Sequence, residues 1–523
     1  MPSSGKKTNA PPAAETLAVI DIGSNSIRMA VGQVLPDGKL EILERLRRAV
    51  RLGQDTFRNG SIRAATMRSA VAILRDYRHV LNTYGVSRVR AVATSAVREA
   101  ANGETFVDRV LAATGLEVSV ISVAEEGRLT VSAVRDALGP KPLGGRTALV
   151  VEVGGGSTVL NLLRKDEITV SQSLPTGSVR MQEVLSTSTE SPDQAAKLIR
   201  HQITSATKAF HSLLPLKQVQ TFIAVSGDAR WAAAQVGKSV DDADFRTVSQ
   251  TALDRLLDEC QHLTADELAR AHHMPFIDAE TIVPALFVYQ VLLQATRARM
   301  MMVTDVSMRD GLLLDLVHDV AGGQDDSAYR AVVQSALAVA RKYQVDIKHA
   351  EHTRFLAVHL FDKLLSEHRL GPRHRLLLEV AALLHEVGTF VSSRAHHKHS
   401  LYLIAHSEIL GLTQDELIMV ANVARYHRRS RPKPSHPDYS HLPRERRIII
   451  NKLAALLRVA DALDNSRTQQ ISDLDCRIDS NGLIISVEGA TDLTFENRSL
   501  LEKGDMLQDI YGFDVRLEQA RRS

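Results

Sequence analysis

Two segments far apart in the sequence place an acidic residue just before a glycine turn, an arrangement suited to holding phosphate groups. The run LAVID is followed by IGSNS, and the run ALVVE is followed by VGGGST. Glycine allows the backbone to approach a ligand closely, and successive exposed amides form a concave site for anions, to which hydroxyl groups add donors. The residues that the turns predict to bind phosphate are Ser24, Asn25, Gly154, Gly155, Gly156, Ser157 and Thr158.

The acids that end the two runs, Asp21 and Glu152, are candidate metal ligands. Carboxylates are hard oxygen ligands of the kind that Mg²⁺ prefers, and an ion held there would face a phosphate chain bound by both turns. Either acid could instead brace its own turn through a side-chain hydrogen bond, a role we expect for one of the two. The pattern therefore predicts an Mg²⁺ site at Asp21 and Glu152.

A second pair of candidate sites lies where later strands lead into helices. Thr94 ends one such strand, with Arg98 one turn into the following helix, and Gly227 and Asp228 hold the matching place in the second half. Helix starts bind anions, and an arginine adds a fork of donors. The sequence predicts that Thr94, Arg98 and Gly227 contact phosphate, although a structural arginine at the surface would show the same spacing.

Glu126 is the candidate catalytic residue. It follows the strand LEVSVIS as part of the doublet Glu125–Glu126. Acids in a first helical turn often only complement the helix dipole. In parallel sheets, however, ligands bind at this end of the strands, where a carboxylate beside a phosphoanhydride could orient and deprotonate a water molecule. A neighbouring negative phosphate would raise the pKa of the carboxyl group toward a useful value.

These residues occupy equivalent places in two halves of a duplicated pattern. Each half is predicted to contain three short strands, a helix, a strand, a helix, a strand and a closing helix, which begins near Glu125 in one half and Met308 in the other. Strands alternating with helices favour a largely parallel sheet with helices on both faces. Two halves related by a pseudo-two-fold axis would leave a cleft between facing turns. Two unrelated α/β domains are the alternative, which the agreement over a whole order of elements disfavours.

The composition is that of an ordered globular protein. The chain has 523 residues, 44% of them hydrophobic and 24% charged, and its net charge of +3 does not demand a nucleic-acid partner. Its two cysteines, Cys260 and Cys476, are too far apart in sequence to suggest a disulfide framework. No apolar run reaches the length of a membrane span, and the N-terminus lacks the apolar centre of a signal peptide. We expect a cytoplasmic protein without membrane contact and with a disordered tail over residues 1–15.

The motifs, in their order and spacing, resemble the exopolyphosphatase and guanosine pentaphosphate phosphohydrolase (Ppx/GppA) family of the actin-like and Hsp70-like phosphotransferase superfamily. The matching stretches are DIGSNSIRM (21–29), ATSAVREA (93–100), ISVAEEGRL (121–129), VVEVGGGST (150–158), LPTGSVRM (174–181) and VSMRDGLL (306–313). The resemblance implies an α/β fold of duplicated actin-like (ribonuclease H-like) ATPase domains over residues 16–140 and 141–322. It also implies that Glu126 activates water, that the loops, Thr94 and Arg98 contact the phosphate chain, and that the protein is a homodimer.

The remaining residues predict an all-α HD-like domain over 323–468 and a small α+β appendage over 469–523. Helical periodicity dominates the first part, which contains most of the 20 histidines. His352, His385, Glu386 and Asp461 occur in an order that resembles HD-type phosphohydrolases and are candidate metal ligands. Glu386 stands where such a metal enzyme needs aspartate, and its longer side chain would misplace the metal bond. Ligand chemistry therefore favours a structural role for this domain.

The resemblance implies Mg²⁺-dependent release of terminal phosphate from inorganic polyphosphate. Guanosine penta- or tetraphosphate is the alternative substrate, and a binding protein without turnover and an actin-fold kinase are the alternative classes. Three positions depart from the family's usual residues: Glu152 replaces aspartate, Val159 replaces glutamate and Asp228 replaces threonine. Because of the lost acid and the added negative charge, a weakened catalyst or a binding protein remains an alternative. Basic runs such as RYHRRSRPKP would attract polyphosphate, but without interleaved aromatic residues they argue against nucleic acid.

Overall fold

The computed structural model describes residues 15–35, 39–139, 145–185, 187, 190–209, 214–240, 245–320, 326–428, 430–479, 482–490 and 492–520. The chain forms two compact units, one ending at Asp325 and the other beginning at Asp326. The tail expected over 1–15 lies outside the described residues apart from Glu15, which opens the first strand. The domain boundaries expected at 140/141 and 322/323 also lie outside them.

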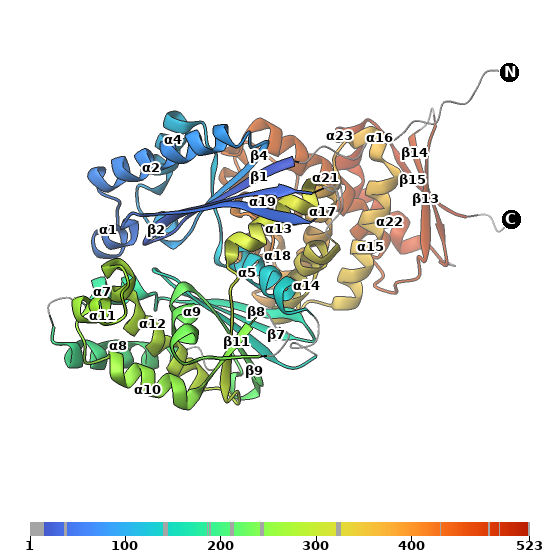
Figure 1. Cartoon of the computed structure of the whole chain (residues 1–523). Helices are drawn as coiled ribbons and strands as arrows, with labels where there is room; N and C mark the ends of the chain where they lie inside the picture. The colour runs from blue at the N-terminus through green and yellow to red at the C-terminus, as the bar shows by residue number, and fades with distance from the viewer. Residues whose placement is uncertain are drawn as a thin grey trace, which may run out of the picture. The chain divides into compact units, whose positions relative to one another are not determined.

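The first lobe of the first unit is built on a five-stranded sheet with the order β3-β2-β1-β4-β5 (Figure 1). Its central strand is buried on both faces and correspondingly apolar, whereas the edge strand β3 alternates half-buried and exposed residues. The elements of this lobe are β1 (Glu15–Ile22), β2 (Ser26–Val34), β3 (Leu40–Ala49), α1 (Leu52–Asn59), α2 (Ala64–Thr83), β4 (Arg88–Ala93), α3 (Ser95–Arg98), α4 (Gly103–Thr114), β5 (Val118–Val120) and α5 (Val123–Leu138).

The second lobe has a seven-stranded sheet with the order β10-β11-β12-β9-β6-β7-β8. Its elements are β6 (Ala148–Val153), β7 (Thr158–Arg164), β8 (Glu167–Leu174), α7 (Ser178–Leu185), α8 (Pro192–Ala209), η2 (Leu216–Gln218), β9 (Thr221–Val225), α9 (Gly227–Val236), β10 (Lys238–Ser239), β11 (Phe245–Ser249), α10 (Gln250–Cys260), α11 (Ala265–Ala271), α12 (Phe276–Gln294), β12 (Met300–Thr304) and α13 (Met308–Val320).

The two sheets repeat one another strand for strand. The order β8-β7-β6-β9-β12 corresponds to β3-β2-β1-β4-β5, and the second lobe adds β10 and β11 beyond β12. In the first sheet the pairs β1–β4 and β4–β5 are parallel, whereas β1–β2 and β2–β3 are antiparallel. The sheets are therefore mixed, and the expectation of a largely parallel sheet is corrected: the hairpins that open each lobe contribute antiparallel pairs.

The closing helix of each lobe packs on the sheet of the other lobe, and the two helices also pack on each other. Leu312 and Leu313 of α13 join a buried cluster with Leu17 and Val19 of β1. Reciprocally, Val131 and Val134 of α5 join a cluster with residues of β6, β7 and β9. Figure 1 shows α5 and α13 between the two lobes. This exchange fixes the two lobes to each other through apolar packing.

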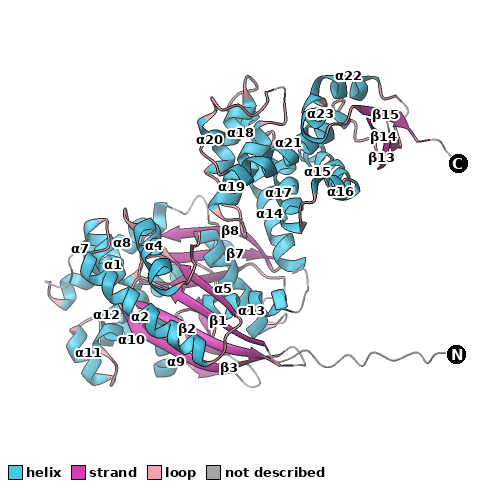
Figure 2. Ribbon diagram, turned by 90° about the horizontal axis from the view of Figure 1, so that it is seen from above, coloured by secondary structure: helices cyan, strands magenta, loops and turns pink. Residues whose placement is uncertain are grey.

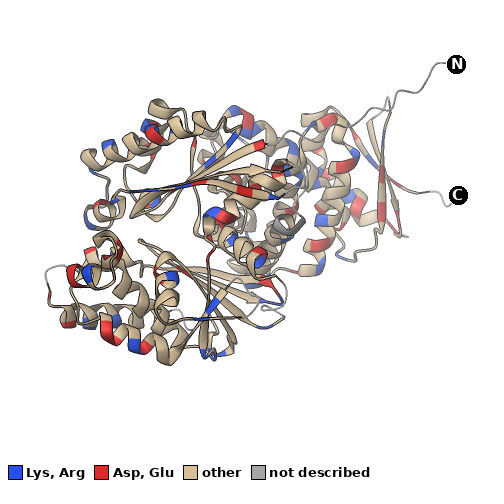
Figure 3. Ribbon diagram, viewed as in Figure 1, with Lys and Arg blue, Asp and Glu red and all other residues tan. Residues whose placement is uncertain are grey.

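Ion pairs also connect the two lobes. Arg47 of β3 makes two hydrogen bonds to the Asp278 carboxylate of α12, at 2.5 and 3.1 Å. Arg51, just before α1, reaches Glu280 of the same helix at 2.7 Å. All four side chains are partly exposed, so each pair contributes modest stability of about 0–1 kcal/mol. Figure 3 shows acidic and basic residues interspersed along the elements, in keeping with the small net charge.

Helix α12 is the one described helix that is long and apolar enough to cross a membrane. Of its apolar window, 67% is buried inside the protein, and its side chains join the main core of the second lobe. It carries Pro284 in its interior. The packing of α12 is that of a core helix.

The second unit is a helical region followed by a three-stranded sheet, ordered β13-β14-β15 (Figure 2). One buried cluster includes helix residues such as Leu456 and sheet residues such as Ile485, so helices and sheet share a core. The elements are α14 (Asp326–Lys342), α15 (Ile347–Lys363), α16 (Leu365–His368), α17 (Pro372–Leu384), η3 (Val387–Phe390), α18 (His396–Ala405), α19 (Gln414–Arg425), α20 (Pro437–Ser440), α21 (Arg444–Leu463), β13 (Asp473–Asp479), β14 (Gly482–Glu488), α22 (Thr494–Lys503), α23 (Asp505–Tyr511) and β15 (Val515–Gln519).

Candidate active site

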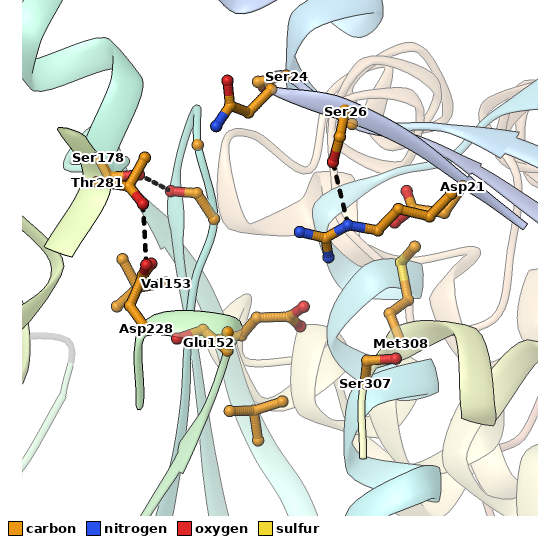
Figure 4. Close-up of a pocket in the computed structure, with 18 of the residues that line it drawn as sticks. Asp21, Ser24, Ser26, Glu152, Val153, Ser178, Asp228, Thr281, Ser307 and Met308 are labelled. Atoms are coloured by element: carbon orange, nitrogen blue, oxygen red, sulfur yellow. Dashed lines mark hydrogen bonds between the residues drawn. The ribbon is translucent and has the colours of Figure 1, made fainter. Parts of the chain in front are cut away.

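A cavity of about 300 Å³ within the first unit gathers most of the residues that the sequence singles out. Figure 4 shows Asp21 and Ser24 on one side of it, with Glu152 and Asp228 on the other. The predicted residues that line it are Asp21, Ser24, Asn25, Thr94, Glu126, Glu152, Gly154, Gly155, Ser157 and Gly227. Both lobes therefore contribute polar groups to the lining of the cavity, and such a lining suits an anionic ligand.

The two predicted phosphate loops have the same turn and touch each other. The amide of Gly23 donates to the Ser26 carbonyl at 3.1 Å, and the amide of Gly154 donates to the Ser157 carbonyl at 2.9 Å. A Cβ atom added at Gly156 would lie 2.9 Å from the hydroxyl oxygen of Ser24 in the first loop, and 2.2 Å from that of Ser95 at the start of α3. Only glycine permits this approach, so the absence of a side chain at 156 is what allows the loops to face each other.

The backbone of the second loop is oriented by helix α7. The carbonyls of Gly154 and Gly155 accept from the amides of Ser178 and Arg180, at 3.0 and 2.9 Å, and the Gly156 carbonyl accepts from Arg180 Nε at 2.5 Å. In a trans peptide the N–H points away from the C=O. Three successive amides are therefore directed away from α7, which is the arrangement of an anion nest.

Three carboxyl groups from different elements surround the cavity: Asp21 of β1, Glu126 of α5 and Glu152 of β6. Burial raises the pKa of each of them. The pKa of Glu152 is raised to about 8, mainly by burial and also by the neighbouring charge of Glu126. A hydrogen bond from the Thr130 hydroxyl to the Glu152 carboxylate acts in the opposite direction and lowers the pKa. A cation is the natural complement of three acids in one enclosed space.

This set of acids fits Mg²⁺. The three do not form a single compact ligand sphere, because within the described chain the one group of three potential ligands with atoms inside 4.8 Å lies in the second unit. Mg²⁺ characteristically binds through one or two carboxylates and completes its octahedron with water and substrate phosphates. Asp21 and Glu152, which hold equivalent places in the two lobes, would be its protein ligands.

Glu126 is positioned by the start of α5 and by an arginine. The Ser122 side chain accepts the amide of Glu125 and caps the helix, so Glu126 lies in its first turn. Arg98 Nη1 donates to the Ile121 carbonyl at 2.6 Å and lies 3.5 Å from Glu126 Oε2. Burial raises the pKa of Glu126 and the Arg98 guanidinium opposes the rise. A buried carboxyl group with a raised pKa is suited to accept a proton near neutral pH.

Arg98, Gly156 and Thr158, which the sequence also predicts as phosphate contacts, lie beside the cavity and not among the residues that line it. Arg98 holds Glu126, as described. Gly156 provides the close approach of the two loops. The Thr158 hydroxyl donates to the Thr176 carbonyl at 3.0 Å and is fully buried, so it braces the loop from behind. These three residues support the wall of the cavity, and their contact with phosphate stays a prediction.

Val159 and Asp228, two of the three departures from the family's usual residues, differ in whether they line the cavity. Val159 lies opposite Glu152 in the β6–β7 pairing and is 1% exposed, so its side chain packs on the same sheet face without lining the cavity. Asp228 lines the cavity at the start of α9, where its carboxylate accepts from the Thr281 hydroxyl at 2.9 Å. Burial raises the pKa of Asp228 to about 6.

Several residues that line the cavity were not predicted from the sequence. Arg28 lies opposite Asp21 in the β1–β2 pairing and lines the cavity, with its Nε donating to the Ser26 hydroxyl at 3.1 Å. It occupies the place in the first hairpin that Val159 occupies in the second, so the register of the repeat could have identified it. Arg230 and Trp231 of α9 also line the cavity. No motif marks them, because helix packing alone directs them there.

The predicted ligands in the second unit are only partly brought together. His385 and Glu386 lie in one compact group with His349, all with ligand atoms within 4.8 Å. Asp461 Oδ1 lies 3.7 Å from His385 Nε2. His352, one turn after His349 on α15, is outside this group and stacks on Phe355. The structure thus places His349 where the sequence analysis expects His352.

Comparison with known proteins agrees with this architecture. An exopolyphosphatase from Cytophaga hutchinsonii superposes with a TM-score of 0.53 at 22% identity, covering 59% of this chain and all of that one. A Ppx/GppA family member from Aquifex aeolicus is 25% identical, with a TM-score of 0.48, and covers 59% of this chain and 98% of that one. The expected fold is confirmed: two actin-like lobes with mixed sheets precede a helical region and a small C-terminal sheet.

A curated relative matches along almost the whole sequence. The guanosine-5'-triphosphate,3'-diphosphate pyrophosphatase of Vibrio parahaemolyticus is 23% identical over 492 residues, which is 90% of this chain and 91% of that protein. The family model described as the Ppx/GppA phosphatase family matches residues 18–320, and the model described as Ppx/GppA phosphatase, domain III, matches residues 333–509. With both models matched over most of its length, the chain belongs to the Ppx/GppA phosphatase family.

Proposed function

We propose that the protein is an exopolyphosphatase, which hydrolyses the terminal phosphoanhydride bond of inorganic polyphosphate with Mg²⁺. The observation that carries the proposal is the position of Glu126, a buried carboxyl group with a raised pKa that faces the same cavity as two glycine loops. A general base and two anion-binding loops around one space are what hydrolysis of a phosphate chain requires.

In the proposed reaction, water attacks the terminal phosphorus in line with the bridging oxygen. The bond from phosphorus to that oxygen breaks, and the proton of the water passes to the Glu126 carboxylate. The directed amides of the second loop and the Arg28 guanidinium hold the phosphate oxygens, while Arg98 fixes the direction of Glu126. Mg²⁺, when bound, supplies neutralisation of charge on the phosphate oxygens.

The decisive experiment measures phosphate release from long-chain polyphosphate with and without Mg²⁺. We expect Glu126→Gln to lower kcat by about 100-fold or more, because an amide cannot accept the proton. Glu117→Gln is the matched control, since Glu117 is exposed and precedes the same strand. Equal rates for wild type and Glu126→Gln would refute the role of Glu126. Tight polyphosphate binding in calorimetry without any release would instead identify a binding protein, the alternative that Asp228 and Val159 motivate.

A guanosine pentaphosphate substrate is the second candidate. Trp231, Met274 and Ile282 give the cavity an apolar flank that could pack against a base, and the Vibrio parahaemolyticus relative is named for a guanosine nucleotide. The test is competition between the two substrates in one assay, repeated with Trp231→Ala. If the nucleotide is the substrate, the variant raises KM for it by about tenfold and leaves KM for polyphosphate unchanged; equal effects on both would reject a base contact at Trp231.

A further inference from the structure

The two acids of the doublet Glu125–Glu126 face different surroundings. Glu126 lines the cavity of the proposed active site, whereas Glu125 does not. The Glu125 carboxylate accepts two hydrogen bonds from Arg128 of the same helix, from Nε and from Nη2, both at 2.9 Å. Successive residues of a helix point about 100° apart, whereas residues three apart share one face. The doublet is therefore divided between two faces of α5, and Glu125 shares its face with Arg128.

An acid from the other lobe packs against this face of α5. The carboxylate of Asp315, in the closing helix α13 of the second lobe, accepts from Arg128 Nη1 at 3.2 Å and from Nη2 at 2.5 Å. Arg90 of β4 donates to the Asp315 carboxylate at 3.0 Å and to the Glu125 carboxylate at 3.3 Å. Each arginine thus bridges both acids through charge-assisted hydrogen bonds, which are the strong ones in proteins. We call Arg90, Glu125, Arg128 and Asp315 the four-charge network.

The four-charge network is largely shielded from solvent. The side chains of Arg128, Glu125 and Asp315 are 9%, 13% and 13% exposed, and that of Arg90 is 33% exposed. Because charges lose their hydration on burial, a buried ion pair adds little net stability compared with apolar side chains, and in some proteins such pairs instead select one arrangement of the chain. Two arginines balance two acids here, so the network is suited to fixing the position of α5.

The sheet of the second lobe restrains α5 on a different side. A Cβ atom added at Gly127 would lie 2.3 Å from Asn161 Oδ1 of β7 and 2.9 Å from Ser171 Oγ of β8. The Ser171 hydroxyl donates to Asn161 Oδ1 at 2.8 Å and holds that side chain in place. The start of α5 therefore has no room to move toward the second sheet. Since Asp315 and Asn161 both belong to the second lobe, that lobe restrains from two sides the helix that carries Glu126.

We propose that Asp315 is a positioning residue for Glu126: through Arg128 it fixes the first turn of α5, and with it the direction of the Glu126 carboxylate in the cavity. This inference rests on the proposed function and adds that the second lobe aims the general base that the first lobe carries. Without the Asp315 carboxylate, Arg128 loses two of its four hydrogen bonds to acids. A general base must lie within hydrogen-bond reach of the water, so a small rotation of this turn lowers the rate of the chemical step.

The test is a double-mutant cycle in the full-length chain, read as phosphate release from polyphosphate. Asp315→Asn keeps the shape of the side chain and removes its charge. We expect it to lower kcat by about tenfold or more and to change KM by less than about twofold, because the phosphate loops are untouched. In a Glu126→Gln background the same substitution should cause no further loss of kcat, since the group that it positions is already gone. Asp319→Asn, at an exposed acid one turn further along α13, is the matched control and should leave both constants unchanged.

The outcomes separate this inference from the proposed function. Equal kcat for Asp315→Asn and wild type would overturn the inference and leave the proposed function intact. An equal further loss in the Glu126→Gln background would also overturn it, because Asp315 would then act on the fold as a whole. Absence of phosphate release from wild type would refute the proposed function and this inference with it.

Arg90→Gln keeps the test decisive if Asp315→Asn fails to fold. Arg90 is the most exposed member of the four-charge network, and its loss leaves the hydrogen bonds between Arg128 and Asp315 in place. We expect this variant to keep the circular-dichroism spectrum of wild type and to lower kcat by about three- to fivefold, again only where Glu126 is present. A loss of the same size in the Glu126→Gln background would overturn the inference.

Discussion

Asp228 brings a titratable negative charge into a cavity that we propose to hold a polyanion. Its carboxyl group lies at the start of α9, and burial raises its pKa to about 6, against the opposing hydrogen bond from Thr281. Below this pH the side chain is neutral and tolerates a phosphate oxygen. Above it the side chain is ionised and repels the substrate, so substrate affinity should depend on pH.

We expect KM for polyphosphate to rise by about three- to tenfold as pH increases from 5 to 7, since a nearby like charge in a partly screened site costs on the order of 1 kcal/mol. Asp228→Asn, which stays neutral, should remove most of this rise. The measurement is KM as a function of pH at constant ionic strength, with Asp108→Asn, at an exposed site in the first lobe, as the control. An unchanged pH dependence in Asp228→Asn would show that Asp228 does not face the substrate.

Residue types and spacing predicted many of the residues that line the cavity, but they missed Arg28, Arg230 and Trp231 and did not show how each residue is used. Asp21 and Glu152 lie next to the last residues of β1 and β6, and Glu126 follows β5; parallel pairing brings such strand ends together within a sheet. The choice between His349 and His352 shows the limit. They are one turn apart on α15, and only the packing of that helix against α17 and α21 selects the residue that lies with His385 and Glu386.

At the scale of elements, the exchange of α5 and α13 between the lobes depends on one glycine. Gly311 of α13 lies so close to α5 that an added Cβ atom would be 2.1 Å from the Leu129 carbonyl oxygen. Leu129 itself is buried among the apolar residues that join α13 to the first sheet. The two helices can approach this closely only because position 311 lacks a side chain.

Gly311→Ala should therefore destabilise the first unit. Because backbone and not a flexible side chain opposes the new methyl group, we expect a loss of about 1–3 kcal/mol in the free energy of unfolding. Denaturant unfolding would measure it. His318→Ala, at an exposed position of the same helix, is the matched control and should change stability by less than about 0.5 kcal/mol. Equal stability of Gly311→Ala and wild type would mean that α13 can shift away from α5 without loss of packing.

The order of the strands that the two lobes share followed from the sequence because hydrophobic periodicity is a local property, whereas β10 and β11 of the second lobe were not predicted. The helices that close the two lobes were predicted near Glu125 and Met308, and α5 and α13 begin at Val123 and Met308. Which sheet each helix covers is not local. The apolar face of α13 would fit either lobe by composition, and the exchange becomes evident only from its contacts with β1 and β2.

At the scale of the whole molecule, each of the two units has its own hydrophobic core. The buried clusters of the first unit contain residues from Leu17 to Leu316, and the cluster of the second contains residues from Val332 to Leu517. The proposed phosphate cavity lies within the first unit. Units with separate cores behave as separate cooperative units when they unfold.

We therefore expect two transitions in scanning calorimetry of the full-length chain, only one of which responds to polyphosphate. A ligand present at about 100 times its dissociation constant stabilises the unit that binds it by about 2.7 kcal/mol. Polyphosphate should raise the midpoint of one transition and leave that of the other unchanged. Arg28→Gln should reduce this shift, because Arg28 lines the cavity of the first unit. A single transition that polyphosphate raises would instead require that the two units unfold together.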